Sequence, residues 1–182
     1  EIIQERLERE GKVTVVQTAP TVTYQILGRD GEVTEIHNPA ELPDPAHIQE
    51  IREPIVTVEI ITPKEAIGDL MKLCEQRRGI YKSQQFLSET RQIMVYELPL
   101  AEILYDFYDK LKSMSRGYGT MDYNLTSFRA EKLVKMDIMV NGKVVDALST
   151  IVHRTKAELR GRVLLLKLKT VIDRHLFEIP LQ

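Results

Sequence analysis

Residues 58–81 read VEIITPKEAIGDLMKLCEQRRGIY, and residues 95–123 read VYELPLAEILYDFYDKLKSMSRGYGTMDY. Both stretches run in the order strand, proline, amphipathic helix, Arg-Gly and strand. One such half alone would expose an apolar sheet face, whereas two halves bury that face together. The repeat therefore predicts an α+β fold with a ferredoxin-like βαββαβ unit over residues 54–127, in which two helices cover one face of a four-stranded antiparallel sheet.

The ends of both predicted helices carry recognisable signals. Thr62 and Glu65 have the spacing of a capping box at the start of the first helix. Gly79 is expected to adopt the left-handed conformation that ends this helix. In the second copy we expect one helix that begins at Pro99 and ends at Arg116.

Two further segments flank this unit. Residues 1–53 resemble the back half of a truncated αβ unit followed by a proline-rich linker. Residues 128–182 contain the hairpin signal Asn141-Gly142 and then an amphipathic helix, so we expect the start of a further αβ domain. The apolar stripe of that helix is predicted to consist of Leu159, Val163 and Leu166. Because the first residue is Glu1, we expect the chain to belong to a longer protein.

Composition and motifs argue against several functional classes. Apolar residues make up 43% and charged residues 29%, as in ordinary globular proteins. No apolar run reaches the roughly eighteen residues that a membrane-spanning helix needs. Neither of the glycine-rich loops that cradle phosphates occurs, and the four histidines lack metal-ligand spacing. We therefore predict no catalytic site, cofactor site or metal site in these residues, and we interpret Cys74 as a buried hydrophobe.

Charge is distributed unevenly along the chain. Residues 1–53 carry 5 basic and 11 acidic side chains, residues 54–127 carry 9 and 10, and residues 128–182 carry 11 and 6. The balances of −6, −1 and +5 add to the net charge of −2. A cationic end of this kind suits an anionic partner such as RNA or DNA, although charge alone is equally compatible with a solvated cationic helix. The carboxylates Glu97, Glu102, Asp106 and Asp109 are interpreted as solvated side chains.

Two of the stretches resemble a known domain. EPIVTVEIITPKEAIGDLMKLCEQRRG and YELPLAEILYDFYDKLKSMSRGYGTMDY are similar to the domain of translational GTPases with the pattern P-L-[SA]-E…L-[RK]-S…[GR]-x-G, as in elongation factor G. The phrase LVKMDIMVNGKVVDALSTIVHR resembles one branch in particular, the LepA or elongation factor four family. The upstream phrases QTAPTVTYQIL, NPAELPDP and IREPIV are also similar to that family.

The resemblance implies an origin for each segment. Residues 1–53 would be the end of the third domain and its linker, residues 54–127 the domain that corresponds to the fifth domain of elongation factor G, and residues 128–182 the start of the C-terminal domain peculiar to this family. The GTP-binding domain, with its GTP and magnesium, would lie outside these residues, so GTPase activity is carried over to no residue here and enzyme status stays open.

The resemblance also implies partners and a location. The longer protein would bind the ribosome at large-subunit RNA and the stalk base, contact tRNA, and act on stalled or mistranslocated ribosomes by promoting reverse translocation. It would be cytoplasmic, with peripheral contact to the inner face of the cell membrane. By charge and segment, the candidates for RNA contact are Arg77, Arg78, Arg116, Arg154, Lys156, Arg160, Arg162, Lys167 and Lys169.

One alternative function comes from a different class. Ferredoxin-like units also serve as regulatory domains that bind small molecules, and a fold does not determine a function. That alternative requires polar groups converging on a pocket at a sheet edge or at a dimer interface.

Overall fold

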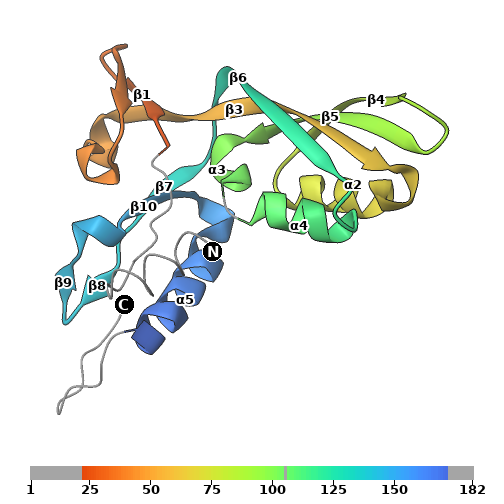
Figure 1. The fold of residues 1–182 in the computed structure, drawn as a ribbon. Coiled ribbons are helices and arrows are strands. Elements are labelled where there is room, and N and C mark those ends of the chain that lie inside the picture. Colours follow the sequence, from red (N-terminus) through yellow and green to blue (C-terminus); the bar gives the residue numbers. More distant parts are fainter. Residues whose placement is uncertain (1–21, 105, 172–182) are drawn as a thin grey trace, which may run out of the picture.

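The computed structural model describes residues 22–104 and 106–171, and it has the predicted α+β fold (Figure 1). The strands are β1 (Tyr24–Gly28), β2 (Val33–Ile36), β3 (Ile48–Pro63), β4 (Ile80–Phe86), β5 (Arg91–Pro99), β6 (Thr120–Ala130), β7 (Leu133–Met136), β8 (Met139–Val140), β9 (Lys143–Val144) and β10 (Thr150–His153). The helices are α2 (Ile67–Gln76), α3 (Leu100–Ile103), α4 (Phe107–Met114) and α5 (Arg154–Val171). Short 3-10 turns are η1 (Pro39–Glu41), η2 (Pro45–His47), η3 (Lys64–Ala66) and η4 (Asp146–Leu148).

The two repeats share one antiparallel sheet, in the order β6-β3-β5-β4. Val58 of the central strand β3 pairs with Tyr96 of β5 on one side and with Tyr123 of β6 on the other. Helices α2 and α4 lie on the same side of this sheet (Figure 1). This is the strand order of a split βαβ arrangement, in which each half contributes one inner and one outer strand.

Strand β3 extends beyond the ferredoxin-like unit at its N-terminal end. It is 16 residues long, and its first part pairs with β1, which in turn pairs with β2. Arg52 pairs with both Gln25 of β1 and Ala130 of β6, so those two strands lie on opposite sides of β3. Strand β3 crosses the predicted boundary at residues 53/54, and β6 crosses the one at 127/128.

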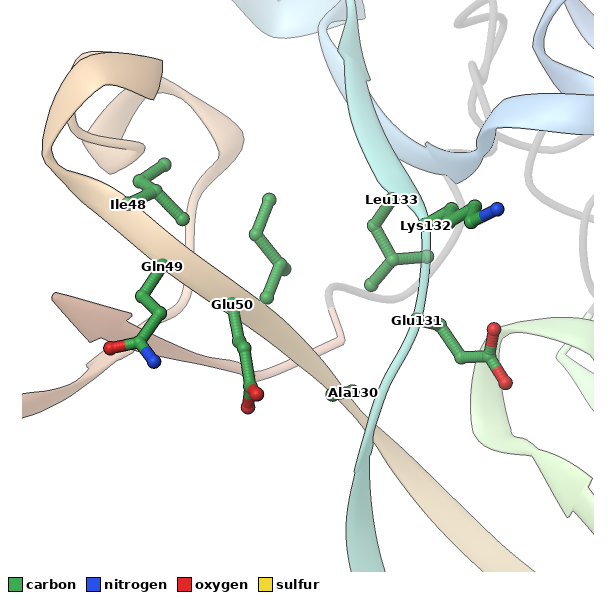
Figure 2. Close-up of a pocket in the computed structure, with 8 residues that line it drawn as sticks. Ile48, Gln49, Glu50, Ala130, Glu131, Lys132 and Leu133 are labelled. Atoms are coloured by element: carbon green, nitrogen blue, oxygen red, sulfur yellow. The ribbon is translucent and has the colours of Figure 1, made fainter. Parts of the chain in front are cut away.

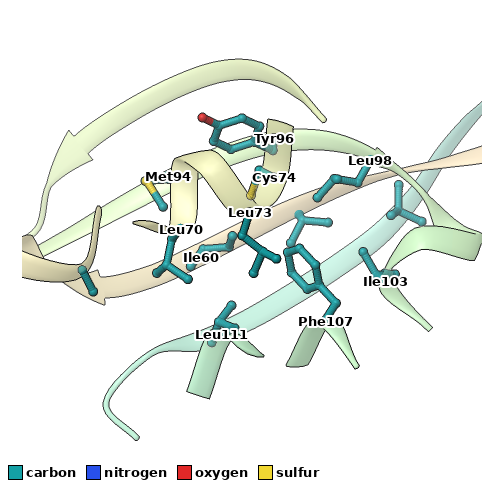
Figure 3. Packing of buried hydrophobic residues seen from close by; sticks show 13 residues of the cluster. Ile60, Leu70, Leu73, Cys74, Met94, Tyr96, Leu98, Ile103, Phe107 and Leu111 are labelled. Atoms are coloured by element: carbon teal, nitrogen blue, oxygen red, sulfur yellow. The ribbon is translucent and has the colours of Figure 1, made fainter. Parts of the chain in front are cut away.

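The main hydrophobic core lies between the sheet and the helices (Figure 3). Leu70 and Cys74 project from α2, and Phe107 and Leu111 project from α4, onto the buried faces of β3 and β5. The interpretation of Cys74 as a buried residue is confirmed, since none of its surface is exposed. Burial raises the pKa of its thiol to about 12, so the thiol is neutral and unreactive at neutral pH.

A second core joins the flanking segments. Its buried members are Val22, just before β1, and residues of β1, β2, β7 and β10, and Leu100, Ala101 and Leu104 at α3 pack against it. The Tyr24 hydroxyl donates a hydrogen bond to the carbonyl oxygen of Ile151 at 3.3 Å. The N-terminal and C-terminal parts of the described chain are therefore packed on each other through this core.

The predicted second helix is two helices. Asp106 has a φ of +35°, which interrupts the helix between α3 and α4. The break lets the first piece contact both cores. Ile103 is buried in the main core together with Phe107 and Leu111, Leu100 packs against both cores, and Leu104 packs against the second one. The prediction of one continuous helix was wrong, because its apolar residues serve two cores rather than one stripe.

The predicted signals at the ends of the first helix were also wrong in detail. The Thr62 hydroxyl donates to the carbonyl oxygen of Pro63, and no side chain caps η3 or α2. The left-handed residue is Arg78, with a φ of +61°, rather than Gly79. Glycine is required at position 79 for a different reason: a Cβ there would lie 2.6 Å from the carbonyl oxygen of Cys74.

Helix α5 is covered on one side and exposed on the other. Gly161 faces Met136 of β7, and a Cβ added at Gly161 would lie only 3.3 Å from the Met136 sulfur. Leu159, Val163 and Leu166 recur at the spacing of one helical face, as predicted, but they are 67%, 48% and 66% exposed. Within the described ranges, no helix is both long and apolar enough to cross a membrane.

Candidate nucleic-acid interface

Glu102 of α3 is a buried carboxylate that four cationic side chains contact. It is 1% exposed. Its oxygens lie 3.7 Å from Arg77, 3.3 Å from Arg78, 3.3 Å from Lys156 and 3.0 Å from Arg160. The interpretation of Glu102 as a solvated side chain was therefore wrong.

The two arginines reach Glu102 from the end of α2. Arg78 also forms a bidentate pair with Glu53 of β3, a second buried carboxylate, at 2.6 and 2.9 Å. Arg77 pairs with Asp106, which also pairs with Lys110 one turn further along α4. The left-handed backbone at Arg78 ends the helix and turns the chain toward β4. The network thus joins the end of α2 to β3, α3 and α4.

Lys156 and Arg160 reach the same carboxylate from α5. They are four residues apart and so share one face of that helix. The Lys156 ammonium also donates a hydrogen bond to the carbonyl oxygen of Gln76, in the last turn of α2, at 2.8 Å. Contacts to an acceptor at a helix C-terminus are favourable for a cation. Helix α5 is therefore held against the ferredoxin-like unit by ionic contacts centred on Glu102.

The protonation equilibria in this network reflect burial and charge together. Burial lowers the pKa of Arg78, but hydrogen bonds and charge from Glu53 and Glu102 outweigh burial and leave that pKa above its ordinary value. Burial also holds the pKa of Lys156 below its ordinary value, although Glu102 partly opposes the shift. For Asp106 burial raises the pKa, and the hydrogen bonds from Arg77 and Lys110 more than compensate, so its pKa is lowered. Removing one charged partner from this network would leave the opposite charge buried and uncompensated.

The structure divides the nine candidates for RNA contact into three groups. Four of them already use charged groups in ion pairs with Glu102 inside the protein: Arg77, Arg78, Lys156 and Arg160. Arg162 is exposed and pairs with the equally exposed Glu158 one turn earlier on α5. The remaining four are exposed. Arg154, Lys167 and Lys169 lie on α5, and Arg116 lies just beyond the end of α4.

Sequence reasoning missed Glu102 and Glu53. No local pattern marks either residue, because Glu102 lies off the apolar stripe and its partners on α5 are more than fifty residues away. The one usable signal is the doubled arginine at the end of α2, since buried carboxylates require paired cations.

The open cleft beside β3 offers little to a small molecule. It has a volume of about 440 Å³ and lies between the start of β3 and the chain that connects β6 to β7. In Figure 2, Leu133 points toward β3, whereas Gln49 and Glu50 point away from Glu131 and Lys132. Specific small-molecule sites bring polar groups together, and these groups diverge.

Comparisons with known proteins agree with the fold. The family model described as elongation factor G C-terminus matches residues 50–139, and the model described as GTP-binding protein LepA C-terminus matches residues 140–182. The chain is 52% identical over all 182 residues to "Elongation factor 4" of Microcystis aeruginosa (strain NIES-843 / IAM M-2473) and 52% identical to that of Oleidesulfovibrio alaskensis (strain ATCC BAA-1058 / DSM 17464 / G20). It is 51% identical to "Elongation factor 4" of Symbiobacterium thermophilum (strain DSM 24528 / JCM 14929 / IAM 14863 / T).

These matches cover the whole chain but only part of each relative. The chain spans 30% of the length of all three relatives. The two family models meet between residues 139 and 140, at the start of the β8–β9 hairpin. From these matches, the chain belongs to the LepA, or elongation factor 4, family of translation factors and carries the C-terminal regions that the two family models describe.

Proposed function

We propose that this chain is the ribosome- and tRNA-docking part of a longer translational GTPase, and that the outer face of α5 contacts RNA. The observation that carries the proposal is that one face of α5 is anchored to the protein while the opposite face exposes cations. Lys156 and Arg160 anchor the helix on Glu102, while Arg154, Arg162 and Lys169 remain exposed. A helix anchored in this way presents its remaining cations on a rigid support.

The chemistry of these side chains suits a phosphate backbone. Arginine and lysine neutralise phosphates, and binding releases the counterions that RNA had condensed. Aromatic side chains, on which unpaired bases stack, do not occur among residues 154–171. We therefore propose backbone contact, which positions the protein without reading sequence.

For the longer protein we propose the activity that the family resemblance implies. GTP and magnesium would bind outside these 182 residues, and the nucleotide state would govern when the C-terminal regions dock on the ribosome. The consequence would be reverse translocation of stalled or mistranslocated complexes. We propose a cytoplasmic location on ribosomes; peripheral contact with the membrane stays a prediction of the resemblance.

The test is co-sedimentation of the chain with ribosomes at several salt concentrations. Log affinity should fall linearly with log salt, and replacing Arg154, Arg162 and Lys169 by glutamine should lower that slope by roughly two and weaken binding about tenfold or more. A control variant loses the same charge outside α5, through Lys64→Gln, Arg91→Gln and Lys143→Gln, at three exposed positions. Binding that is insensitive to salt, or that the control weakens equally, would contradict the proposal.

A further inference from the structure

The internal repeat carries a second copy of the acidic pair Glu102 and Asp106, of which Glu102 anchors α5. Glu102 and Asp106 stand four residues apart at the start of the second helical region, and Glu65 and Asp69 stand four residues apart at the start of the first, 37 residues earlier in each case (102 − 65 and 106 − 69). The buried residues Ala66, Leu70 and Cys74 match Ile103, Phe107 and Leu111 with the same offset of 37. The two pairs therefore occupy equivalent places in the repeat.

The arginines that end the helices correspond as well, although their offset is 38 (116 − 78) and not 37. Arg78 and Arg116 both precede a glycine, and their φ angles are +61° and +53°. Because α2 and α4 run antiparallel, the end of each helix lies beside the start of the other. The end of α2 contacts Asp106 through Arg77, and the end of α4 lines a groove with Glu65 and Asp69.

This second groove has a volume of about 400 Å³ and a mixed lining. Glu65 and Asp69 form one wall, and the last residue of α4 and the residues after it form the other. Met114 and Tyr118 are 39% and 65% exposed there, so apolar and aromatic surface stands beside the carboxylates. The full lining is Pro63, Glu65, Ala66, Asp69, Met114, Ser115, Arg116 and Tyr118.

The two equivalent places differ in what occupies them. At the first, Lys156 and Arg160 of α5 complete the ion pairs of Glu102. At the second, neither Glu65 nor Arg116 forms an ion pair with any part of the chain that the structure describes, and Asp69 is 4.0 Å from the exposed Lys72. The carboxylates outnumber the arginine in the groove, so its charge favours a cation over a phosphate.

We propose that the groove between the start of α2 and the end of α4 is a docking site for a basic segment of a partner protein, which presents lysine or arginine to Glu65 and Asp69 as α5 does to Glu102. The aliphatic stem of such a side chain would pack on Met114, and its charged head would lie over the ring of Tyr118. This surface is separate from the outer face of α5 and does not depend on RNA contact there.

The probe is a fluorescently labelled, capped, alanine-rich helical peptide with one lysine and one arginine four residues apart, the spacing of Lys156 and Arg160. Fluorescence anisotropy should show saturable binding to the chain, and a peptide with glutamine at both positions should not bind. The double variant Glu65→Gln/Asp69→Asn should weaken binding by about tenfold, the loss expected for two exposed charge pairs. A thermal melt of each variant verifies that it is folded.

The matched control is Glu89→Gln/Asp109→Asn, which removes two exposed carboxylates outside the groove and should leave peptide binding unchanged. Replacing Arg154, Arg162 and Lys169 should also leave peptide binding unchanged, so the peptide test and the RNA test are independent of each other. Equal binding by wild type and Glu65→Gln/Asp69→Asn would overturn the inference. A labelled RNA hairpin is the competing ligand. If the hairpin displaces the peptide, binds Glu65→Gln/Asp69→Asn more tightly than wild type and does not bind Arg116→Gln, the groove holds RNA and the inference is overturned.

Discussion

At the scale of single residues, Glu102 decides how α5 is held. Its carboxylate contacts four cations while only 1% of the residue is exposed. Replacement by glutamine keeps the shape and removes the charge, so the cations lose their shared partner. We expect Glu102→Gln to lower the free energy of unfolding by about 3–5 kcal/mol, as for other buried pairs broken from one side.

Urea denaturation of this variant measures the loss. Glu158→Gln is the control, since Glu158 pairs with Arg162 at the surface and its side chain is 78% exposed. That change should shift stability by less than about 0.5 kcal/mol. An equal loss in both variants would show that the network around Glu102 contributes nothing beyond surface ion pairing.

Asp106 and Glu97 give the stability a dependence on pH. The pKa of Asp106 is lowered by Arg77 and Lys110 against the opposing effect of burial, and hydrogen bonds from Lys82 and Arg129 lower the pKa of Glu97. A depressed pKa means that the stabilisation is complete above the ordinary pKa of the carboxyl and is lost as pH falls through the folded value. We expect stability to decrease below about pH 4. The decrease should be smaller in Asp106→Asn/Glu97→Gln, as followed by urea denaturation between about pH 3 and 7; the same decrease in both proteins would contradict the assignment.

At the scale of elements, two glycines of the first helical region should respond in opposite directions. Gly68 lies within α2, and a Cβ added there would project into open space. A Cβ at Gly79 would instead lie 2.6 Å from the Cys74 carbonyl oxygen and 3.0 Å from Leu98. Gly68→Ala should stabilise the protein by about 0.5–1 kcal/mol through helix propensity. Gly79→Ala should destabilise it by about 1–3 kcal/mol through backbone displacement.

Chemical denaturation of the two single variants checks this pair. Gly31→Ala is a useful reference, since Gly31 has a φ of +86° with free space around it and should report left-handed strain of about 1–2 kcal/mol without a clash. A stabilising effect at position 79 would mean that the close approach to Cys74 does not constrain the end of α2.

At the scale of the whole molecule, the repeat was sufficient to predict the ferredoxin-like unit, because its strands and helices follow local periodicity. The break at Asp106 could not be predicted, since it accompanies contacts of α3 with a second core, made by distant strands, in addition to the main one. The ionic anchoring of α5 could not be predicted for the same reason: Lys156 and Glu102 are far apart in sequence. Composition identified the cations but could not distinguish those engaged with Glu102 from those facing solvent.

Because the flanking segments share the second core, we expect them to unfold as one cooperative structure, and hydrogen exchange tests this. Ile26 of β1 is 1% exposed and belongs to the same core as Ile151 of β10. Ile26→Ala should lower the free energy of unfolding by about 2–4 kcal/mol and accelerate amide exchange in β7 and β10, which lie about a hundred residues or more away in sequence. Leu70→Ala in the main core is the matched variant, and it should first accelerate exchange in α2 and in the strands that it covers. Unchanged exchange in β7 and β10 of Ile26→Ala would show that the C-terminal segment is held by the Glu102 network alone, because the two cores would then be energetically separate.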